Sequence, residues 1–229
     1  MGKQSKEQYA LLTDYDLNTS FSEAFHTLFA NIRLNWETDT SEPAYIHTLL
    51  LTSVSEYVEQ GAVAANLAII AAQSDYKTIL VDADLRSPSL PQRFGLDQSV
   101  GLSNLLEEIS ITPQKVSEHL QSTFIPGLQI LSSGTSTSAG ATLLLSPKLE
   151  TCMDSIRQVL VEPGNAPGIV IYHSSPVLVG ADASLIGALT EQTLLTVVTS
   201  RTTREQAKQA QEQLEQAHAK LVGAIMVNP

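Results

Sequence analysis

The feature that most constrains the fold is a strand, a buried helix and a second strand between residues 46 and 82. A short apolar run, Ile46 to Leu51, precedes a polar loop and then the helical segment Gly61 to Ala72, which is rich in Ala, Val, Ile and Leu. A second apolar run, Thr78 to Val81, ends in Asp82. Nearly continuous apolar strands joined through a helix are typical of a parallel sheet that is covered on both faces.

The rest of the sequence continues this alternation and predicts one α/β domain, doubly wound, over residues 20–229. Residues 1–19 are polar and without periodicity, so we expect a flexible arm there. A helix is expected to follow, capped by Ser20 or Ser22 and reaching Trp36. Further strands are predicted at 128–131, 169–172, 194–199 and 223–227, and further helices at 101–108, 147–161, 183–189 and 203–220.

Charge and composition exclude several classes of function. The net charge of −11 disfavours nucleic acid and anionic membranes as partners, since the only candidates for a basic patch are scattered residues such as Arg201 and Arg204. No apolar run approaches the roughly 18 to 20 residues that span a bilayer, and the N-terminus lacks the apolar core of a signal peptide. The single cysteine, Cys152, is expected to be a buried apolar residue. These features predict a cytoplasmic protein.

Ligands of open parallel sheets bind where the strands end, which directs attention to the loops 52–60, 82–91, 132–142 and 173–182. The second loop follows the strand of ILVDADLRSP and carries Asp82, Asp84 and Arg86. Such an Asp-x-Asp pair can hold Mg²⁺ through water and orient a nucleophile. The alternative is that Asp82 caps a turn and Asp84 is solvated, which is the commoner role of an isolated pair of this kind.

From Ser20 onward the sequence resembles the bacterial tyrosine autokinases, the cytosolic kinase domains of capsule and exopolysaccharide assembly. These kinases are related to the MinD/ParA group of P-loop ATPases, so the resemblance implies a P-loop NTPase-like fold. The matching segments follow one another in the order and spacing of the family: SEAFHTLFANI (22–32), LTSVSEYVEQGAVAANLAI (51–69), ILVDADLRSPSLPQRFGL (79–96), VGLSNLLEE (100–108), LQILSSG (128–134) and SSPVLVGADA (174–183).

The phosphate-binding loop of this family is degenerate here. Where the family has P-G-E-G-K-S-T, this chain has Glu56, Tyr57, Val58, Glu59, Gln60, Gly61 and Ala62. Such a loop needs glycines for close backbone approach, a lysine charge and a hydroxyl for Mg²⁺. Each carboxylate placed about 4 Å from a phosphate costs on the order of 4 kcal/mol at an effective dielectric of 20. We therefore expect neither ATP nor Mg²⁺ as a cofactor.

Three further departures from the family pattern point the same way. His173 stands where the resemblance implies a second metal-binding aspartate, and neutral imidazole is a poor ligand for Mg²⁺. The family's ring-forming motif E-x-x-R-x-x-R becomes Glu23, His26 and Phe29, and core packing is the favoured role of that phenylalanine. The C-terminal tyrosine cluster of the family is absent after Tyr172. A transition-metal site of His173 with Asp82 and Asp84 is the less favoured use of these residues.

The departures from the family pattern predict a non-catalytic, pseudokinase-like subunit that binds a protein partner. The resemblance implies that this partner is the membrane chain-length regulator of a polysaccharide export system. It leaves open whether the chain forms a homo-oligomer or a hetero-oligomer with an active homologue, and the partner would recruit it to the inner face of the membrane. The alternative is an active tyrosine kinase or ATPase that binds ATP and Mg²⁺ through Asp82, Asp84 and Arg86. A MinD/ParA-like positioning factor is the third hypothesis, although that role needs an ATP switch.

Overall fold

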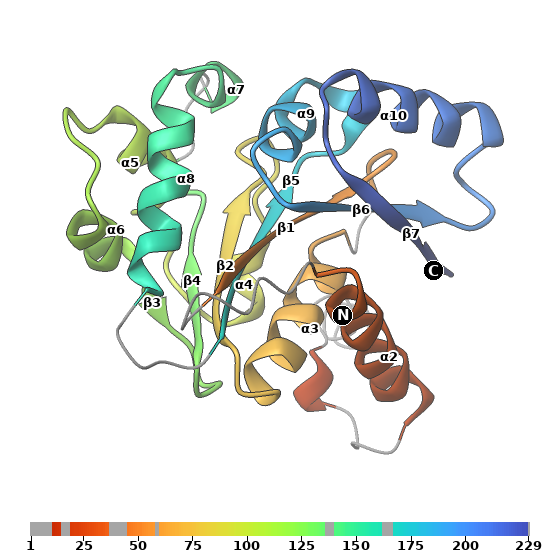
Figure 1. Cartoon of the computed structure of the whole chain (residues 1–229), viewed down its shortest axis with the longest axis horizontal. Coiled ribbons are helices and arrows are strands. Elements are labelled where there is room, and N and C mark those ends of the chain that lie inside the picture. The colour runs from red at the N-terminus through yellow and green to blue at the C-terminus, as the bar shows by residue number, and fades with distance from the viewer. Residues whose placement is uncertain are drawn as a thin grey trace, which may run out of the picture.

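The computed structural model describes residues 11–14, 19–36, 45–57, 60–135, 140–161 and 167–228. Seven strands form one sheet in the order β3-β4-β2-β5-β1-β6-β7, and every neighbouring pair is parallel except β3 with β4. Figure 1 shows this twisted sheet in the centre of the molecule. The strands are β1 Ile46–Ser53, β2 Lys77–Ala83, β3 Gln121–Ser122, β4 Leu128–Leu131, β5 Gly168–Ser174, β6 Gln192–Val198 and β7 Leu221–Val227.

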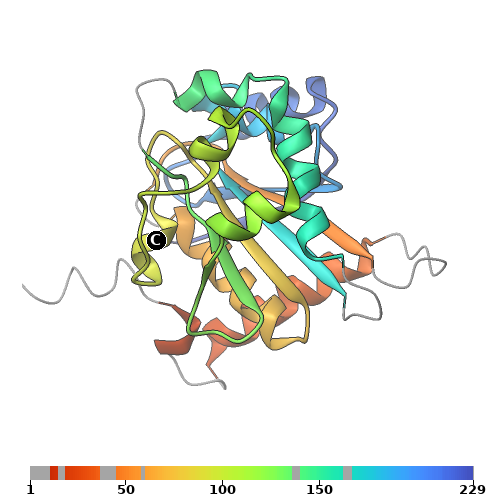
Figure 2. The same cartoon turned by 90° about the vertical axis from the view of Figure 1, so that its left-hand side faces the viewer.

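Helices cover both faces of the sheet, and each face has its own apolar core. One core joins the sheet to α5, α6, α7, α8, α9 and α10, and the other joins it to α2, α3 and α4. Figures 1 and 2 show these two layers on opposite sides of the strands. The predicted doubly wound α/β architecture is therefore confirmed. The helices are α2 Ser20–Leu34, α3 Gln60–Gln73, α4 Leu90–Arg93, α5 Leu102–Glu107, α6 Pro113–His119, α7 Gly140–Leu144, α8 Lys148–Val159, α9 Asp182–Gly187 and α10 Arg204–Gln216.

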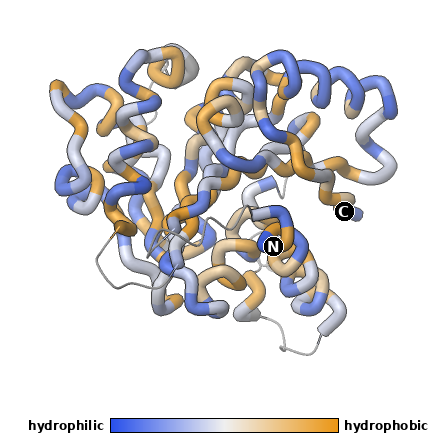
Figure 3. Tube along the Cα trace, in the orientation of Figure 1, coloured by the Kyte–Doolittle hydropathy of each residue, from blue (hydrophilic) through white to orange (hydrophobic). Residues whose placement is uncertain are grey.

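The apolar content of each helix determines its depth in the fold. Helix α3 is apolar on nearly every side and is buried between the sheet and α2. Helix α10 is the opposite case, because only Ala210 and Leu214 are buried along it, as the predicted narrow apolar stripe requires. Figure 3 shows α10 as hydrophilic over most of its length. Thr203 caps α10 by accepting a hydrogen bond from the Gln206 backbone N–H.

Two expectations for the N-terminal region need correction. The cap of α2 is Thr19, whose Oγ1 accepts a hydrogen bond from the Ser22 backbone N–H, and not Ser20 or Ser22. Within the range predicted as a flexible arm, Leu11 and Leu12 are buried against the core of α2 and α3. Residues 1–10 and 15–18 lie outside the described part of the chain, so the domain boundary stays a prediction.

Several short elements were not predicted. Helices α4, α6 and α7, strand β3 and the 3₁₀ turns Leu12–Asp14 and Val177–Val179 are all shorter than the windows in which periodicity can be recognised. The loop 132–142 is thus partly helical, since α7 begins at Gly140. Within the described ranges, no helix has both the length and the apolar character needed to cross a bilayer.

Candidate functional site

The sheet order brings three of the four predicted loops together at the carboxyl ends of β2, β5 and β1. Asp82 on β2 and His173 on β5 are register partners, and His173 is also aligned with Leu51 on β1. The fourth loop follows β4 on the far side of β2. Its described residues 132–135 contact the start of α5, where Ser132 and Ser133 accept backbone hydrogen bonds from Leu102 and Ser103.

Asp82 is fully buried and holds its own loop together. Its Oδ1 accepts a hydrogen bond from the Asp84 backbone N–H at 3.3 Å, and its Oδ2 accepts from the backbone N–H groups of Ser89 at 3.1 Å and Leu90 at 3.0 Å. Burial raises the pKa of the Asp82 carboxyl to about 7, although these hydrogen bonds oppose the rise. Asp82 therefore has the turn-capping role that was the alternative to metal binding.

Asp84 is also buried, in contrast to the solvated position expected for a structural Asp84, and four donors surround its carboxylate. Ser175 Oγ donates to Oδ1 at 2.6 Å and Gln60 Nε2 donates to Oδ2 at 2.9 Å. The backbone N–H groups of Arg86 and Ser87 also donate to Oδ1, at 3.2 and 3.0 Å. All three sequence-distant loops thus meet at this carboxylate. Neither Gln60 nor Ser175 could be recognised as its partner from the sequence, because they lie 24 and 91 residues away.

The residues predicted to form a degenerate phosphate loop differ in burial. Tyr57 is only 8% exposed, whereas Glu56 is exposed. Gly61 lies in the first turn of α3, and a Cβ added to it would approach Ser89 Oγ to 2.6 Å. Helix α4 and the residue before it therefore pack directly on the N-terminus of α3. Val58 and Glu59 lie outside the described residues, and Ala62 is half-buried on α3.

His173 is buried beside these groups without hydrogen-bonding to them. Both of its ring nitrogens lack a hydrogen-bond partner among the described residues. Burial lowers the pKa of His173 to about 4, and the Asp84 carboxylate opposes this shift only in part. The imidazole is therefore neutral at physiological pH. Within the described chain no three His, Cys, Asp or Glu side chains form a group that could hold a metal ion.

Arg86 is paired away from the carboxylates of its own loop. Its Nε donates to Asp182 Oδ2 at 2.7 Å and its Nη2 donates to Asp182 Oδ1 at 3.3 Å, at the start of α9. Gly180 makes room for this pair, since a Cβ there would lie 2.7 Å from Arg86 Nη2. The Arg86–Asp182 ion pair therefore connects the loop that follows β2 to the start of α9.

The three residues at the positions of the family's ring-forming motif differ in burial. Glu23 and His26 are exposed on α2. Phe29 is buried and packs edge-on against Trp36 and Tyr76, which confirms the expected core role. Cys152 is buried as predicted, and burial raises the pKa of its thiol to about 12.

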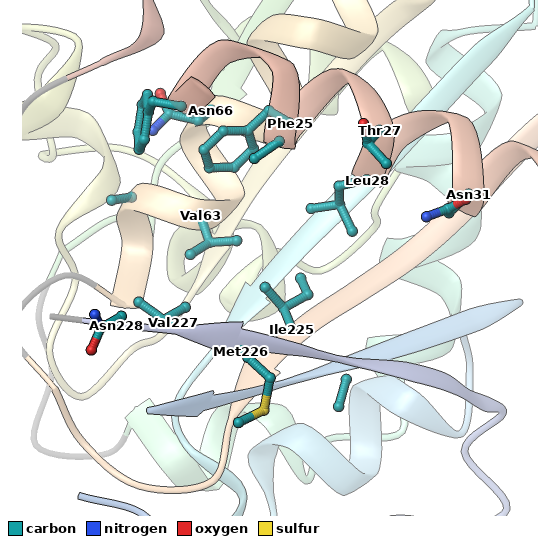
Figure 4. A pocket seen from close by; sticks show the side chains of 14 residues that line it. Phe25, Thr27, Leu28, Asn31, Val63, Asn66, Ile225, Met226, Val227 and Asn228 are labelled. Atoms are coloured by element: carbon teal, nitrogen blue, oxygen red, sulfur yellow. The ribbon is translucent and has the colours of Figure 1, made fainter. Parts of the chain in front are cut away.

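A groove of about 520 Å³ lies between α2, the first turns of α3 and strand β7, and Ala62 of the predicted phosphate loop lines it. Figure 4 shows Phe25 and Leu28 of α2 facing Ile225 of β7 across it, with Val63 of α3 between them. No motif in the sequence indicates this groove. Its only signal was the unusual apolar content of β7 and of the α2 face, which periodicity assigns to the core.

Comparison with known proteins places the chain among bacterial tyrosine kinases. No family model matches it. The tyrosine-protein kinase YwqD of Bacillus subtilis (strain 168) is 32% identical over 205 residues, which cover 90% of this chain and 80% of that protein. The crystal structure of the chimerical protein CapA2B2 superposes with a TM-score of 0.80 at 26% identity, covering 97% of this chain and 90% of that one. The septum site-determining protein MinD of Pyrococcus horikoshii OT3 shares the fold alone, with a TM-score of 0.61 at 18% identity over 79% of this chain and 70% of MinD.

Proposed function

The chain belongs to the family of bacterial tyrosine-protein kinases, and on that premise we propose that it is a non-catalytic member that acts by binding a protein partner in polysaccharide polymerisation or export. The partner that fits the family is a membrane chain-length regulator, which would recruit this cytoplasmic chain to the inner face of the membrane. Regulation or assembly, and not phosphoryl transfer, is then the task of the subunit.

The observation that carries this proposal is the hydrogen bond from Gln60 to Asp84. Gln60 begins α3 at the position of the family's phosphate-binding lysine, and its amide instead holds Asp84 Oδ2 at 2.9 Å. With Ser175 Oγ and two backbone N–H groups on the other oxygen, the carboxylate already accepts four hydrogen bonds, so a metal ion would have to compete with protein donors. A Mg²⁺ ion binds through such carboxylate oxygens, directly or through water.

Electrostatics support the same conclusion. The N-terminus of α3 offers a partial positive charge, but the lysine that would add a full charge is replaced by neutral Gln60. Glu56 adds an exposed carboxylate to the loop between β1 and α3, in which the family holds the phosphate. A repulsion on the order of 4 kcal/mol for each close pair of like charges corresponds to roughly a thousandfold weaker binding.

The active-kinase alternative requires Arg86 and Asp84 to face a nucleotide. Arg86 is engaged with Asp182 and Asp84 with Gln60 and Ser175, so these bonds would have to break first. ATP and Mg²⁺ remain the cofactors of that alternative only.

Calorimetric titration of the full chain with Mg·ATP tests the proposal, with YwqD as the positive control. We expect no saturable heat up to millimolar nucleotide and no transfer of the γ-phosphate to tyrosine. Saturable binding in the micromolar range that is lost in Asp84→Asn would overturn the non-catalytic assignment. Asp84→Asn is preferred to a change at Asp82 because Asp82 holds three backbone N–H groups of the fold.

A further inference from the structure

The three loops that follow β1, β2 and β5 are hydrogen-bonded to one another in pairs. Gln60, at the end of the first loop, donates to Asp84 of the second, and Ser175 of the third donates to the same carboxylate. The third loop also bonds directly to the first, because the Leu178 N–H donates to the Val54 carbonyl at 3.2 Å. These bonds form a closed set in which each loop is held by both of the others.

The side chains that make these bonds are shielded from water. Asp84 and Ser175 are each 1% exposed, and Gln60 is half-buried. Thr52 Oγ1 adds a buried bond between the first and third loops, since it donates to the Ser175 carbonyl at 3.0 Å. A buried polar group that loses its partner stays desolvated without compensation. Opening any one of the three loops is therefore unfavourable as long as the other two stay in place.

The Asp84 carboxylate has the central position in this set of bonds. In P-loop proteins that switch, the phosphate of the nucleotide and its Mg²⁺ order the surrounding loops, which are released when the phosphate leaves. Here an anion of the protein itself accepts hydrogen bonds from two neighbouring loops and from its own, through Gln60, Ser175, Arg86 and Ser87. Because this anion is part of the chain, it cannot dissociate as a nucleotide does.

We propose that the Asp84 carboxylate takes the place of a bound nucleotide in holding the three loops together, so that this edge of the domain keeps one arrangement with and without ATP. The inference rests on the proposed non-catalytic function and adds how the subunit is regulated: its partner meets the same surface at all times, without a nucleotide switch. The loops then open together and not one at a time, since they share one network of hydrogen bonds.

Hydrogen exchange of the full chain, measured for single amides by NMR, tests whether the loops open together. Gln60→Leu removes the bond between the first two loops and changes no atom of the third. We expect the Leu178 N–H in the third loop to exchange about fivefold faster, which corresponds to the loss of one hydrogen bond of average strength. In the reverse direction, Ser175→Ala should speed exchange of the Gln60 N–H, which donates to the Tyr57 carbonyl in the first loop.

The matched control is Gln98→Leu. Gln98 is half-buried, as Gln60 is, and its Nε2 donates to Ser133 Oγ at 3.1 Å outside the three loops. This control should leave the Leu178 N–H at its wild-type exchange rate. The inference is overturned if Gln60→Leu speeds exchange only within the first loop, or if Gln98→Leu affects Leu178 equally. If Ser175→Ala fails to fold, Gln60→Leu and its control still decide.

The same exchange rates separate this inference from the proposed function. Mg·ATP added to the wild-type chain should leave the rates of all three loops unchanged. Slower exchange with Mg·ATP would overturn the non-catalytic function together with the inference, because a nucleotide would then hold the loops. Loops that open one at a time and do not respond to Mg·ATP would overturn the inference alone.

Discussion

Two loops at the same edge of the sheet differ in how closely they follow the family pattern. The loop between β1 and α3 differs at every position from the phosphate-binding motif that the resemblance implies, whereas the loop between β2 and α4 has Asp82, Asp84 and Arg86 as the resemblance implies. The lost lysine, glycines and hydroxyl serve a ligand and do little for the empty fold. The retained carboxylates accept backbone hydrogen bonds from their own loop, and the retained arginine fastens that loop to α9. Keeping an Asp-x-Asp pair is therefore not by itself evidence of retained chemistry.

The comparison also shows which side chains stand in the first loop at the positions of the family's phosphate-binding residues. Tyr57 is buried at a position where the family has glycine, and Gln60 donates to the carboxylate that a metal ion would otherwise approach. Under the proposed function the first loop serves packing and not ligand binding, and the second loop has a structural role.

The largest expected effect tests whether Asp82 is structural. At pH 5, Asp82→Ala should lower the free energy of unfolding by about 3 kcal/mol or more, because three backbone N–H groups lose their acceptor. Asp82→Asn keeps one acceptor oxygen and should cost about 1 kcal/mol. The control from the other loop, Glu56→Ala at an exposed position, should stay within about 0.5 kcal/mol. Urea denaturation measures all three, and equal costs for Asp82→Ala and Glu56→Ala would break the comparison.

The second prediction concerns pH, because Asp82 and His173 titrate in opposite directions. The pKa of Asp82 rises from 3.8 to about 7 on folding, so the folded state binds its proton more tightly and stability from this group falls as pH rises from 4 to 7. The pKa of His173 falls from 6.5 to about 4, so stability from this group increases as pH rises from 4 to 6.5. In the wild-type protein the two slopes oppose each other.

Single substitutions should separate these slopes. Relative to wild type, Asp82→Asn should gain stability with rising pH between 4 and 6.5, and His173→Leu should lose it, each by up to about 1.4 kcal/mol per pH unit. Leucine is suitable because neither ring nitrogen of His173 has a partner among the described residues. Urea denaturation at pH 4.5, 5.5 and 6.5 measures both series. If the free energy of unfolding changed with pH in the same way in both variants, burial would not be the cause of the two pKa shifts.

The sequence predicted the repeating architecture well because apolar strands and the apolar α3 are long local signals. Strand β4 was placed at its observed bounds, and all strands except β3 were predicted. Helix α6 was missed although Thr112 caps it and Pro113 begins it, because Val116 is its only buried residue and one apolar position shows no period.

The candidate site was only partly accessible from the sequence. The resemblance identified which phosphate-loop groups are missing, and the sheet order brought their loops together as expected. What replaced the ligand contacts depends on tertiary contacts, such as those of Ser175 with Asp84 and Asp182 with Arg86, that no local pattern specifies. The groove beside β7 was invisible for the same reason, since an exposed edge strand and a buried one have similar sequences.

A smaller effect is expected for the Arg86–Asp182 ion pair, which joins the loop between β2 and α4 to α9. A double-mutant cycle with Arg86→Met and Asp182→Asn should give a coupling free energy of about 1 kcal/mol. The pair is bidentate and Asp182 is buried, but Arg86 is 37% exposed, so solvent screens the interaction. Coupling near zero would indicate that Arg86 is retained for another purpose, and nucleotide binding by wild type but not by Arg86→Met would identify that purpose as nucleotide binding.

The smallest expected effect is that of restoring one residue of the family's phosphate-binding loop. Gly61→Ser returns the family's first hydroxyl position, but the new Cβ would lie 2.6 Å from Ser89 Oγ and 3.3 Å from Leu90 Cδ2. Rotation of the Ser89 side chain relieves most of this contact, so thermal or urea denaturation should show a loss of about 0.5 to 1 kcal/mol. Ser89 Oγ has no partner among the described residues, so Ser89→Ala should be nearly neutral alone and should reduce the cost of Gly61→Ser when the two are combined. If Gly61→Ser is free of cost without Ser89→Ala, then α4 does not obstruct the old phosphate site, and only the loop residues themselves prevent nucleotide binding.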